Sequence, residues 1–421
     1  MTGGEGTAGE PAGEGSTRPS RIAVAFSGGL DTSWLVAKLA GEGHAVDAVT
    51  VDVGGFDPAA RAALRARALS LGAESFRLVE ARRALFDEVL RFLIAGNVRR
   101  GGIYPLCVGA ERALQAREVA RVARELGASA VAHGSTAAGN DQVRLEAALR
   151  ATAPEIEVLA PVRDLAPTRA EEAAFLASRG HAVPARDTSY SVNSGLWGTT
   201  IGGRETLSSE LPLPETEWVR TRGAFDDPRP PRRVAIAFER GIPVALDGAP
   251  LAPVELIEAL DAIAASFGIG RGIHLGETIL GTKGRVAFEA PAATVLIEAH
   301  RELEKLVLTG KQLSLKNALA ESYGELVHGG LWIEPAARDI EAFLASSQAR
   351  VTGMVTALLR PGCCFIEGVS SPFSLLAASR GAYGEVAGDW TPADARGFAR
   401  IHPLPALLHA RAGSHPREAA P

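Results

Sequence analysis

Residues 27–33 read Ser-Gly-Gly-Leu-Asp-Thr-Ser. They follow the apolar run Ile22-Ala23-Val24-Ala25-Phe26 and lead into Trp34-Leu35-Val36-Ala37-Lys38-Leu39, so the pattern predicts a strand, a tight loop and a helix. Glycines let the loop turn sharply and approach a ligand, while the loop amides and the helix N-terminus favour an anion. Ser27, Thr32 and Ser33 add hydroxyl donors to the same segment. The stretch therefore predicts a phosphate-binding loop.

Two well-known nucleotide motifs do not fit this loop. It lacks the lysine of the Walker A motif and the glycine spacing of the dinucleotide fingerprint. The alternative to a phosphate loop is an ordinary turn between a strand and a helix, in which Asp31 or Thr32 caps the helix.

The bulk composition limits the classes of protein to consider. With 421 residues the chain exceeds one typical core, and 46% hydrophobic with 22% charged residues is typical of a globular protein. A net charge of −5 argues against a broad nucleic-acid-binding surface. Three cysteines are too few for a disulfide framework, and no stretch resembles a membrane span or a signal peptide. We expect a cytoplasmic protein that binds neither nucleic acid nor membranes.

Strands and helices alternate in the first half of the chain. The expected strands are 22–26, 45–53, 76–79, 129–132 and 156–160, and the expected helices include 82–94, 111–126 and 168–179. Such repeats favour an α/β fold with a parallel sheet whose ligands bind at the carboxyl ends of the strands. Thr168 and Glu171 have the spacing of a capping box.

The pattern changes after Pro184, where residues 188–230 show no clear periodicity. We therefore expect a second, α+β domain. Its expected strands are 234–238, 243–246 and 286–288, and its expected helices are 253–267, 293–308 and 314–327. The predicted organisation is a disordered tail at 1–20, a nucleotide-binding domain at 21–187, a second domain at 188–402 and a C-terminal arm at 403–421.

A second polar loop follows the fourth strand of the first half. Residues 133–144 read His-Gly-Ser-Thr-Ala-Ala-Gly-Asn-Asp-Gln-Val-Arg. Small and hydrogen-bonding groups with one acid and one arginine suit an amino acid, and a position at a strand end would let this loop face the first one. The alternative is a loop in which Asn140 or Asp141 caps the next helix.

The motifs together resemble the argininosuccinate synthase family over about residues 21–335. The resemblance rests on the first loop, Val51-Asp52-Val53-Gly54, Tyr104-Pro105-Leu106 and the loop from Gly134 to Arg144, in the family's order. It implies a pyrophosphate loop in a nucleotide-binding domain, a synthetase and multimerisation domain, and a homotetramer. In that family ATP adenylates the ureido oxygen of citrulline with release of pyrophosphate, and the aspartate amine then displaces AMP. ATP and Mg²⁺ are the implied cofactors.

The resemblance also implies roles for individual residues. Catalytic roles fall on Ser27, Asp31 and Thr32, with Asp31 either in the magnesium shell or capping the helix. The implied ATP-binding residues are Ala25, Phe26, Ser27, Gly28, Gly29, Leu30, Asp31, Thr32, Ser33, Val51 and Gly134. The implied aspartate-binding residues are Thr136, Asn140 and Asp141. The implied acceptor-binding positions are Tyr104, Val108, Gly109, Asn140, Arg144, Ser191, Thr200, Glu277 and Phe288.

The acceptor positions depart from the family pattern. Val108 and Gly109 replace residues with hydroxyls, Phe288 replaces a tyrosine, and Gly276 falls where a glutamate belongs unless a one-residue shift restores Glu277. Each buried polar partner lost costs about 1–3 kcal/mol of binding. We therefore expect a ligase whose ureido or amide acceptor is citrulline or a less polar relative. The alternatives are an ordinary argininosuccinate synthase using citrulline and a non-catalytic ATP-binding homologue.

Overall fold

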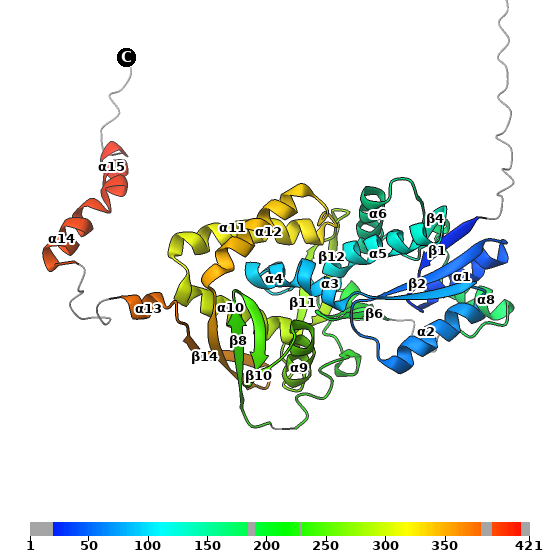
Figure 1. Ribbon diagram of the computed structural model, residues 1–421, viewed down its shortest axis with the longest axis horizontal. Helices are drawn as coiled ribbons and strands as arrows, with labels where there is room; N and C mark the ends of the chain where they lie inside the picture. The colour runs from blue at the N-terminus through cyan, green and yellow to red at the C-terminus, as the bar shows by residue number, and fades with distance from the viewer. Residues whose placement is uncertain (1–19, 184–189, 228, 380–389, 414–421) are drawn as a thin grey trace, which may run out of the picture.

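The structure is a computed structural model that describes residues 20–183, 190–227, 229–379 and 390–413. The expected tail at 1–20 therefore lies, apart from Ser20, outside the described residues. Figure 1 shows two adjoining halves, with the N-terminal sheet on one side and the mixed second domain on the other. Among the described residues, no helix is both long enough and apolar enough to cross a membrane.

A five-stranded parallel sheet of order β3-β2-β1-β4-β5 forms the first half, as the sequence predicts. Its strands are β1 (Arg21–Ala25), β2 (Ala45–Asp52), β3 (Ser75–Glu80), β4 (Ala130–His133) and β5 (Glu157–Leu159). Its helices are α1 (Leu30–Gly41), α2 (Pro58–Ser70), α5 (Arg112–Glu125), α6 (Asn140–Thr152), α7 (Pro161–Leu165) and α8 (Arg169–Ser178). The order reverses between β1 and β4, and in sheets of this kind ligands bind at such a reversal, beside the carboxyl ends of the strands.

Helices cover both faces of this sheet because successive side chains of a strand point to opposite sides. Ile22 and Val24 of β1 belong to one apolar cluster, together with Leu35 of α1, and Ala23 belongs to the other. The capping box predicted before α8 is confirmed, since Thr168 Oγ1 accepts from the Glu171 amide at 3.2 Å.

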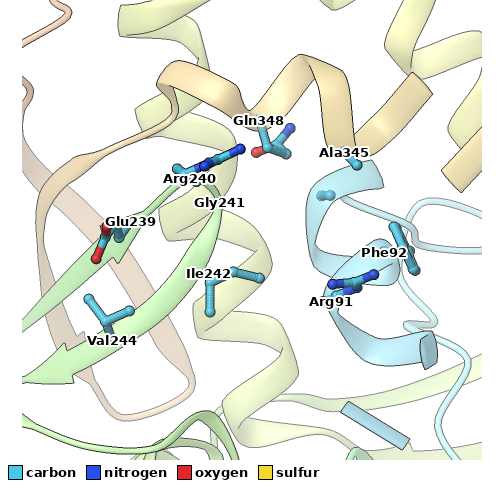
Figure 2. Close-up of a pocket in the computed structure, with 10 residues that line it drawn as sticks. Arg91, Phe92, Glu239, Arg240, Gly241, Ile242, Val244, Ala345 and Gln348 are labelled. Atoms are coloured by element: carbon cyan, nitrogen blue, oxygen red, sulfur yellow. The ribbon is translucent and has the colours of Figure 1, made fainter. Parts of the chain in front are cut away.

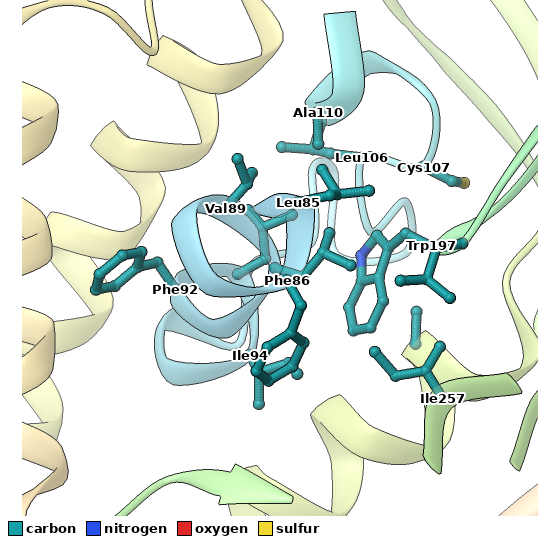
Figure 3. Close-up of a cluster of buried hydrophobic side chains, with 14 of the residues drawn as sticks. Leu85, Phe86, Val89, Phe92, Ile94, Leu106, Cys107, Ala110, Trp197 and Ile257 are labelled. Atoms are coloured by element: carbon teal, nitrogen blue, oxygen red, sulfur yellow. The ribbon is translucent and has the colours of Figure 1, made fainter. Parts of the chain in front are cut away.

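The helix expected over residues 82–94 is interrupted. It consists of α3 (Arg82–Leu85), a π-helical turn (Phe86–Leu90) and α4 (Arg91–Gly96). Leu85, Phe86 and Val89 of this segment are fully buried, and Figure 3 shows them beside Trp197 and Ile257 from the second half. The π-helical turn lies in a segment that packs against both halves, and a helical periodicity in the sequence does not reveal it.

Two sheets form the second half. An antiparallel sheet of order β10-β9-β8-β13-β14 packs against α9 (Pro253–Ala265) and α10 (Pro291–Val307). Its strands are β8 (Arg232–Glu239), β9 (Ile242–Leu246), β10 (Ala249–Pro250), β13 (Gly353–Arg360) and β14 (Cys363–Ser370). A four-stranded sheet of order β11-β12-β7-β6 lies nearer the first half (Figure 1). Its strands are β6 (Tyr190–Gly195), β7 (Gly198–Gly203), β11 (Arg271–Glu277) and β12 (Lys283–Glu289).

The hairpin β6–β7 lies in the stretch 188–230, which the sequence shows as without periodicity. Glycines at 195, 198, 202 and 203 hide the alternation of a strand, because they contribute no side chain to the pattern. The hairpin tip reaches the first domain, where the Leu196 amide donates to Val53 O at 2.8 Å.

The remaining helices complete the second half and the C-terminal region. They are α11 (Gly310–His328), α12 (Pro335–Ser347), α13 (Leu375–Ala378), α14 (Pro392–Ile401) and α15 (Leu404–Gly413). Figure 1 shows α14 and α15 apart from the rest of the molecule. The arm expected at 403–421 is described up to residue 413, as the exposed helix α15.

Candidate active site

The first loop connects β1 to α1 as predicted. Gly28 has a φ of +77°, a conformation that favours glycine, and a Cβ there would lie 2.4 Å from Leu64 Cδ2 and displace that side chain. Ser27 and Gly29 are exposed, and Ser27 Oγ lies 3.2 Å from Thr32 Oγ1. The loop thus presents a backbone turn and two adjacent hydroxyls at the carboxyl end of β1.

Ser33 supports the loop from inside. Its hydroxyl donates to Gly29 O at 2.6 Å and accepts from Arg67 Nε of α2 at 2.8 Å. Arg67 Nη2 is buried and has no hydrogen-bond partner among the described residues, and burial lowers the pKa of this guanidinium. The sequence does not point to Arg67, because this arginine lies 34 residues after Ser33 on α2, a helix that is mostly exposed.

The start of α1 corrects one alternative reading of the loop. The N-cap is Gly29, no side chain caps the helix, and Asp31 lies within the first turn. Asp31 and Thr32 are therefore not helix caps. Asp31 faces Glu172 of α8, which is 2% exposed, and burial together with the Asp31 carboxylate raises the pKa of Glu172.

The other nucleotide positions of the sequence prediction lie around the same strand ends. Phe26 is buried, and its amide and carbonyl bond to Val49 O at 2.8 Å and to Thr50 Oγ1 at 2.7 Å. Val51 is buried in β2, Leu30 is buried at the start of α1, and Ala25 ends β1. These residues shape the crevice through their backbone, since their side chains pack into the core.

The second loop contacts the first. A Cβ on Gly134 would lie 3.0 Å from Thr32 Cγ2 and 3.2 Å from Thr32 N, so the two loops touch at the ends of the neighbouring strands β1 and β4. The N-cap of α6 is Gly139, again without a side-chain cap, so the alternative role of Asn140 and Asp141 as helix caps is wrong. Thr136 is exposed on this loop.

Asp141 lies between two arginines. Arg112 Nε donates to its Oδ2 and Arg144 Nη1 to its Oδ1, both at 2.9 Å. Burial favours the neutral carboxyl, but the two guanidinium groups outweigh it and lower the pKa of Asp141 to about 2. Arg112 also donates to Asn193 Oδ1 of β6 at 3.2 Å. The sequence places Arg112 and Asn193 in no motif, and their role emerges only from the fold.

The acceptor positions Tyr104, Gly109, Arg144 and Phe288 come together in the interior. Tyr104 donates to Cys107 O at 2.6 Å, and its ring stacks on His274 and tilts against Phe288, with centroid distances of 5.4 and 5.1 Å. A Cβ on Gly109 would lie 3.2 Å from Arg144 Cζ.

Arg144 itself also reaches across to α11. Its Nε donates to His328 O at 2.9 Å, and its Nη2 lies 3.1 Å from His328 Nδ1. Burial and the neighbouring Arg144 lower the pKa of His328 to about 3, so this imidazole is neutral.

The other acceptor positions are more scattered. Val108 is buried with a φ of +64°, Ser191 is exposed on β6, and Thr200 lies opposite Phe288 in the sheet. Glu277 is exposed and ion-paired with Lys283 at 2.8 Å. Asn140, expected on both amino-acid sides, accepts from the Ile279 amide at 2.8 Å.

A side chain on Gly276 would displace its neighbours. A Cβ there would lie 2.5 Å from His274 Nε2 and 3.3 Å from Arg100 Nη1. An imidazole thus occupies the space beside this glycine.

A cavity of about 410 Å³ lies elsewhere, between α4, the β8–β9 turn and the end of α12. Figure 2 shows Arg91 and Arg240 on opposite walls, with Gln348 above them. None of the predicted site residues lines this cavity. The convergence of loops at the sheet edge, rather than this cavity, marks the candidate active site.

Comparisons with known proteins show the family to which the chain is similar. Residues 21–184 match the family described as "Arginosuccinate synthase N-terminal HUP domain", and residues 190–409 match "Arginosuccinate synthase C-terminal domain". The curated "Argininosuccinate synthase" of Methanocaldococcus jannaschii is 37% identical over 92% of this chain and 98% of its own length.

Two bacterial relatives are equally similar. The "Argininosuccinate synthase" of Xylella fastidiosa is 38% identical over 92% of this chain and 97% of its own length. That of Xanthomonas axonopodis pv. citri is 37% identical over 93% of this chain and 94% of its own. The similarity extends across both halves.

Proposed function

The chain belongs to the argininosuccinate synthase family of AMP-forming carbon–nitrogen ligases, and from that premise we propose that it joins aspartate to the carbonyl carbon of a ureido or amide acceptor at the expense of ATP. One observation carries the proposal. The contact between Gly134 and Thr32 sets the amino-acid loop directly against the phosphate loop, so an activated acceptor and aspartate would meet beside the leaving pyrophosphate.

In the first step the acceptor's carbonyl oxygen attacks the α-phosphorus of ATP, and the bond from that phosphorus to the pyrophosphate oxygen breaks. Negative charge grows on the departing pyrophosphate. The amides of the loop from Ser27 to Gly29 and the hydroxyls of Ser27 and Thr32 are fixed donors suited to that charge. Arg67, held against Ser33, adds positive charge behind the loop.

In the second step the aspartate amine attacks the activated carbon, the bond from carbon to the AMP oxygen breaks, and the nitrogen loses a proton. We assign Asp141 to bind the amino group of the aspartate substrate. Its depressed pKa keeps it ionised at neutral pH, and Arg112 and Arg144 hold both oxygens in place. Thr136 and Asn140 belong to the same loop and complete the proposed aspartate site.

Mg²⁺ fits this site as an ion bound largely through phosphate. Among the described residues no three His, Cys, Asp or Glu side chains gather to hold a metal. Mg²⁺ commonly uses one or two carboxylates together with waters and substrate phosphates. Asp31, in the first turn of α1 and partly exposed, is the carboxylate in position to supply that ligand, and the ion would neutralise charge on the phosphates.

The acceptor is citrulline or a relative with a less polar far end. The packing supports the relative with the less polar far end. Arg144 covers Gly109, His274 covers Gly276, and Phe288 packs on Tyr104 without a hydroxyl. These changes surround Tyr104 and remove hydrogen-bonding groups, while the proposed ATP and aspartate positions keep theirs. An ordinary argininosuccinate synthase using citrulline remains the alternative.

Release of pyrophosphate and AMP from ATP and aspartate tests the proposal, measured with citrulline and a panel of carbamoyl and amide acceptors. We expect turnover that requires both aspartate and an acceptor, with a less polar acceptor favoured over citrulline. Robust turnover with citrulline at a micromolar KM would establish the alternative acceptor. ATP binding without AMP formation for any acceptor would instead indicate a non-catalytic homologue.

We also propose a homotetramer in the cytoplasm. The family resemblance and the exposed apolar side chains of α14 and α15, such as Phe398, Ile401 and Leu408, support an oligomer. The low cysteine content supports the location.

A further inference from the structure

One buried carboxyl group at the candidate site has no role in the steps above. Glu111 precedes α5 and is 1% exposed. Its Oε1 has no hydrogen-bond partner among the described residues, and its side chain does not cap the helix. A buried carboxyl oxygen without a partner is unfavourable, and such groups in native proteins often mark a place where a ligand or water binds.

Glu111 lies where the three parts of the site meet. Its carboxyl packs on the hairpin tip, because a Cβ on Gly195 would lie 1.9 Å from Oε1 and 2.5 Å from Oε2. The next residue, Arg112, bonds Asp141 of the amino-acid loop and Asn193 of the hairpin. Gly109, an acceptor position by family resemblance, lies in the same helical turn as Glu111.

Charges of both signs surround the carboxyl, and no described residue forms an ion pair with it. Burial raises the pKa of Glu111 to about 8, Arg112 and Arg220 oppose the rise, and Asp141 adds to it. Arg220 donates hydrogen bonds to Thr199, to Asp261 and to the carbonyls of Gly195 and Gly198. Arg112 donates hydrogen bonds to Asp141, Gln115 and Asn193. The guanidinium groups of Arg112 and Arg220 thus donate to other groups, and Glu111 Oε1 can accept from another donor.

We propose that Glu111 is an acceptor-binding residue whose Oε1 accepts a hydrogen bond from an N–H group of the ureido or amide acceptor. This inference rests on the proposed ligase function and names the chemistry of its acceptor. The positions just before it, Val108 and Gly109, lack the hydroxyls that the family would offer, and Glu111 supplies a polar group from the same turn. An ionised carboxylate accepts from the N–H groups of a urea, and a protonated one pairs with an amide through two hydrogen bonds, so both protonation states suit this class.

Two variants and a matched control test the inference. Glu111→Ala removes the carboxyl, and Glu111→Met removes it while keeping the length of the side chain, whereas Glu125→Gln changes an exposed glutamate at the end of α5. The probes are the best carbamoyl acceptor of the panel and its N,N-dimethyl derivative, which lacks the terminal N–H groups. KM is measured for the acceptor, ATP and aspartate. Binding of both probes is measured by calorimetry in the presence of α,β-methylene ATP, in case turnover is absent.

We expect Glu111→Ala to raise the acceptor KM or dissociation constant roughly tenfold or more for the carbamoyl probe, with little change for the dimethyl probe. The KM of ATP and of aspartate should stay within about twofold of wild type, and Glu125→Gln should change nothing. Equal losses for both probes, an unchanged acceptor constant, or no binding of either probe to the wild type would overturn the inference.

The proposed function fails separately, if the wild type forms no AMP with any acceptor. If Glu111→Ala does not fold, Glu111→Met decides the question through the ratio of the two probes' constants, because methionine keeps the length of the side chain without the accepting oxygen. An unchanged ratio would then contradict the role of Glu111.

Discussion

Asp31 and Glu172 show how much the charge state of a residue depends on its neighbours in the fold. The motif predicts a functional role for Asp31, but it cannot reveal that a second carboxyl from α8 faces it. The same holds for Asp141, since the second loop predicts this acid and Arg144 three residues later, but not Arg112, which bonds the same carboxylate. Glu172 and Arg112 are distant in sequence from Asp31 and Asp141 and meet them only through packing, so no local pattern encodes these two contacts.

The buried Glu172 predicts a specific dependence of stability on pH. Its pKa is raised in the folded protein above its ordinary 4.5, so its contribution to stability is complete below about pH 4.5 and is lost as pH rises through the folded value. We compare the melting temperature of Glu172→Gln with that of the wild type at each pH. We expect this difference to shift in favour of the variant by about 2 °C or more from pH 5 to pH 8. Thermal unfolding at both pH values measures this. Parallel curves for variant and wild type, as expected for the exposed control Glu125→Gln, would contradict it.

At the scale of elements, two units of strand, loop and helix lie side by side. The sequence predicts both units, because apolar runs followed by glycine and then a helical pattern are local signals. It does not show how closely the loops approach. Gly134 and Thr32 are in contact because β1 and β4 are neighbours in the sheet, and that order depends on the whole topology.

A methyl group on Gly134 tests this contact. It would lie 3.0 Å from Thr32 Cγ2, and relieving the overlap requires the phosphate loop or the second loop to move. We expect Gly134→Ala to weaken ATP binding about tenfold, in line with roughly 1–3 kcal/mol for overpacking. Calorimetric titration with an ATP analogue measures the loss. Gly310→Ala, at an open helical position, is the control, and equal affinity in the two variants would rule out a close approach of the loops.

At the scale of the molecule, a buried polar network joins the two halves. Lys316 of α11 and Glu304 of α10 are fully buried and 3.0 Å apart, and Lys316 also donates to Ala95 O at 2.9 Å. Asn97, which follows α4, donates to Glu304 at 2.6 Å. Burial lowers the pKa of Lys316, with Glu304 opposing this effect. The largest apolar cluster likewise includes residues from both halves, so the expected boundary at 187 separates segments of chain that share one core.

Removing Lys316 should destabilise the whole molecule, because Glu304 would be left as a buried charge without a cation. We expect Lys316→Met to lower the free energy of unfolding by about 3–5 kcal/mol, and the double variant with Glu304→Gln to lose less than Lys316→Met alone. Urea unfolding at neutral pH measures both. Lys311→Met, at an exposed position, should stay close to the wild type. A loss below about 1 kcal/mol for Lys316→Met would show that the network contributes little.

Local patterns in the chain were enough to predict the loop between β1 and α1, the parallel sheet and the family, because glycines, hydroxyls and apolar periodicity act over a few residues. They also located Asp141 and Arg144. The hairpin β6–β7, the break at Phe86–Leu90 and the isolation of Glu111 were decided by tertiary structure. In each case the deciding contacts join residues far apart in the chain, and burial and charge at such contacts exist only once the sheet order and the packing of both halves bring them together.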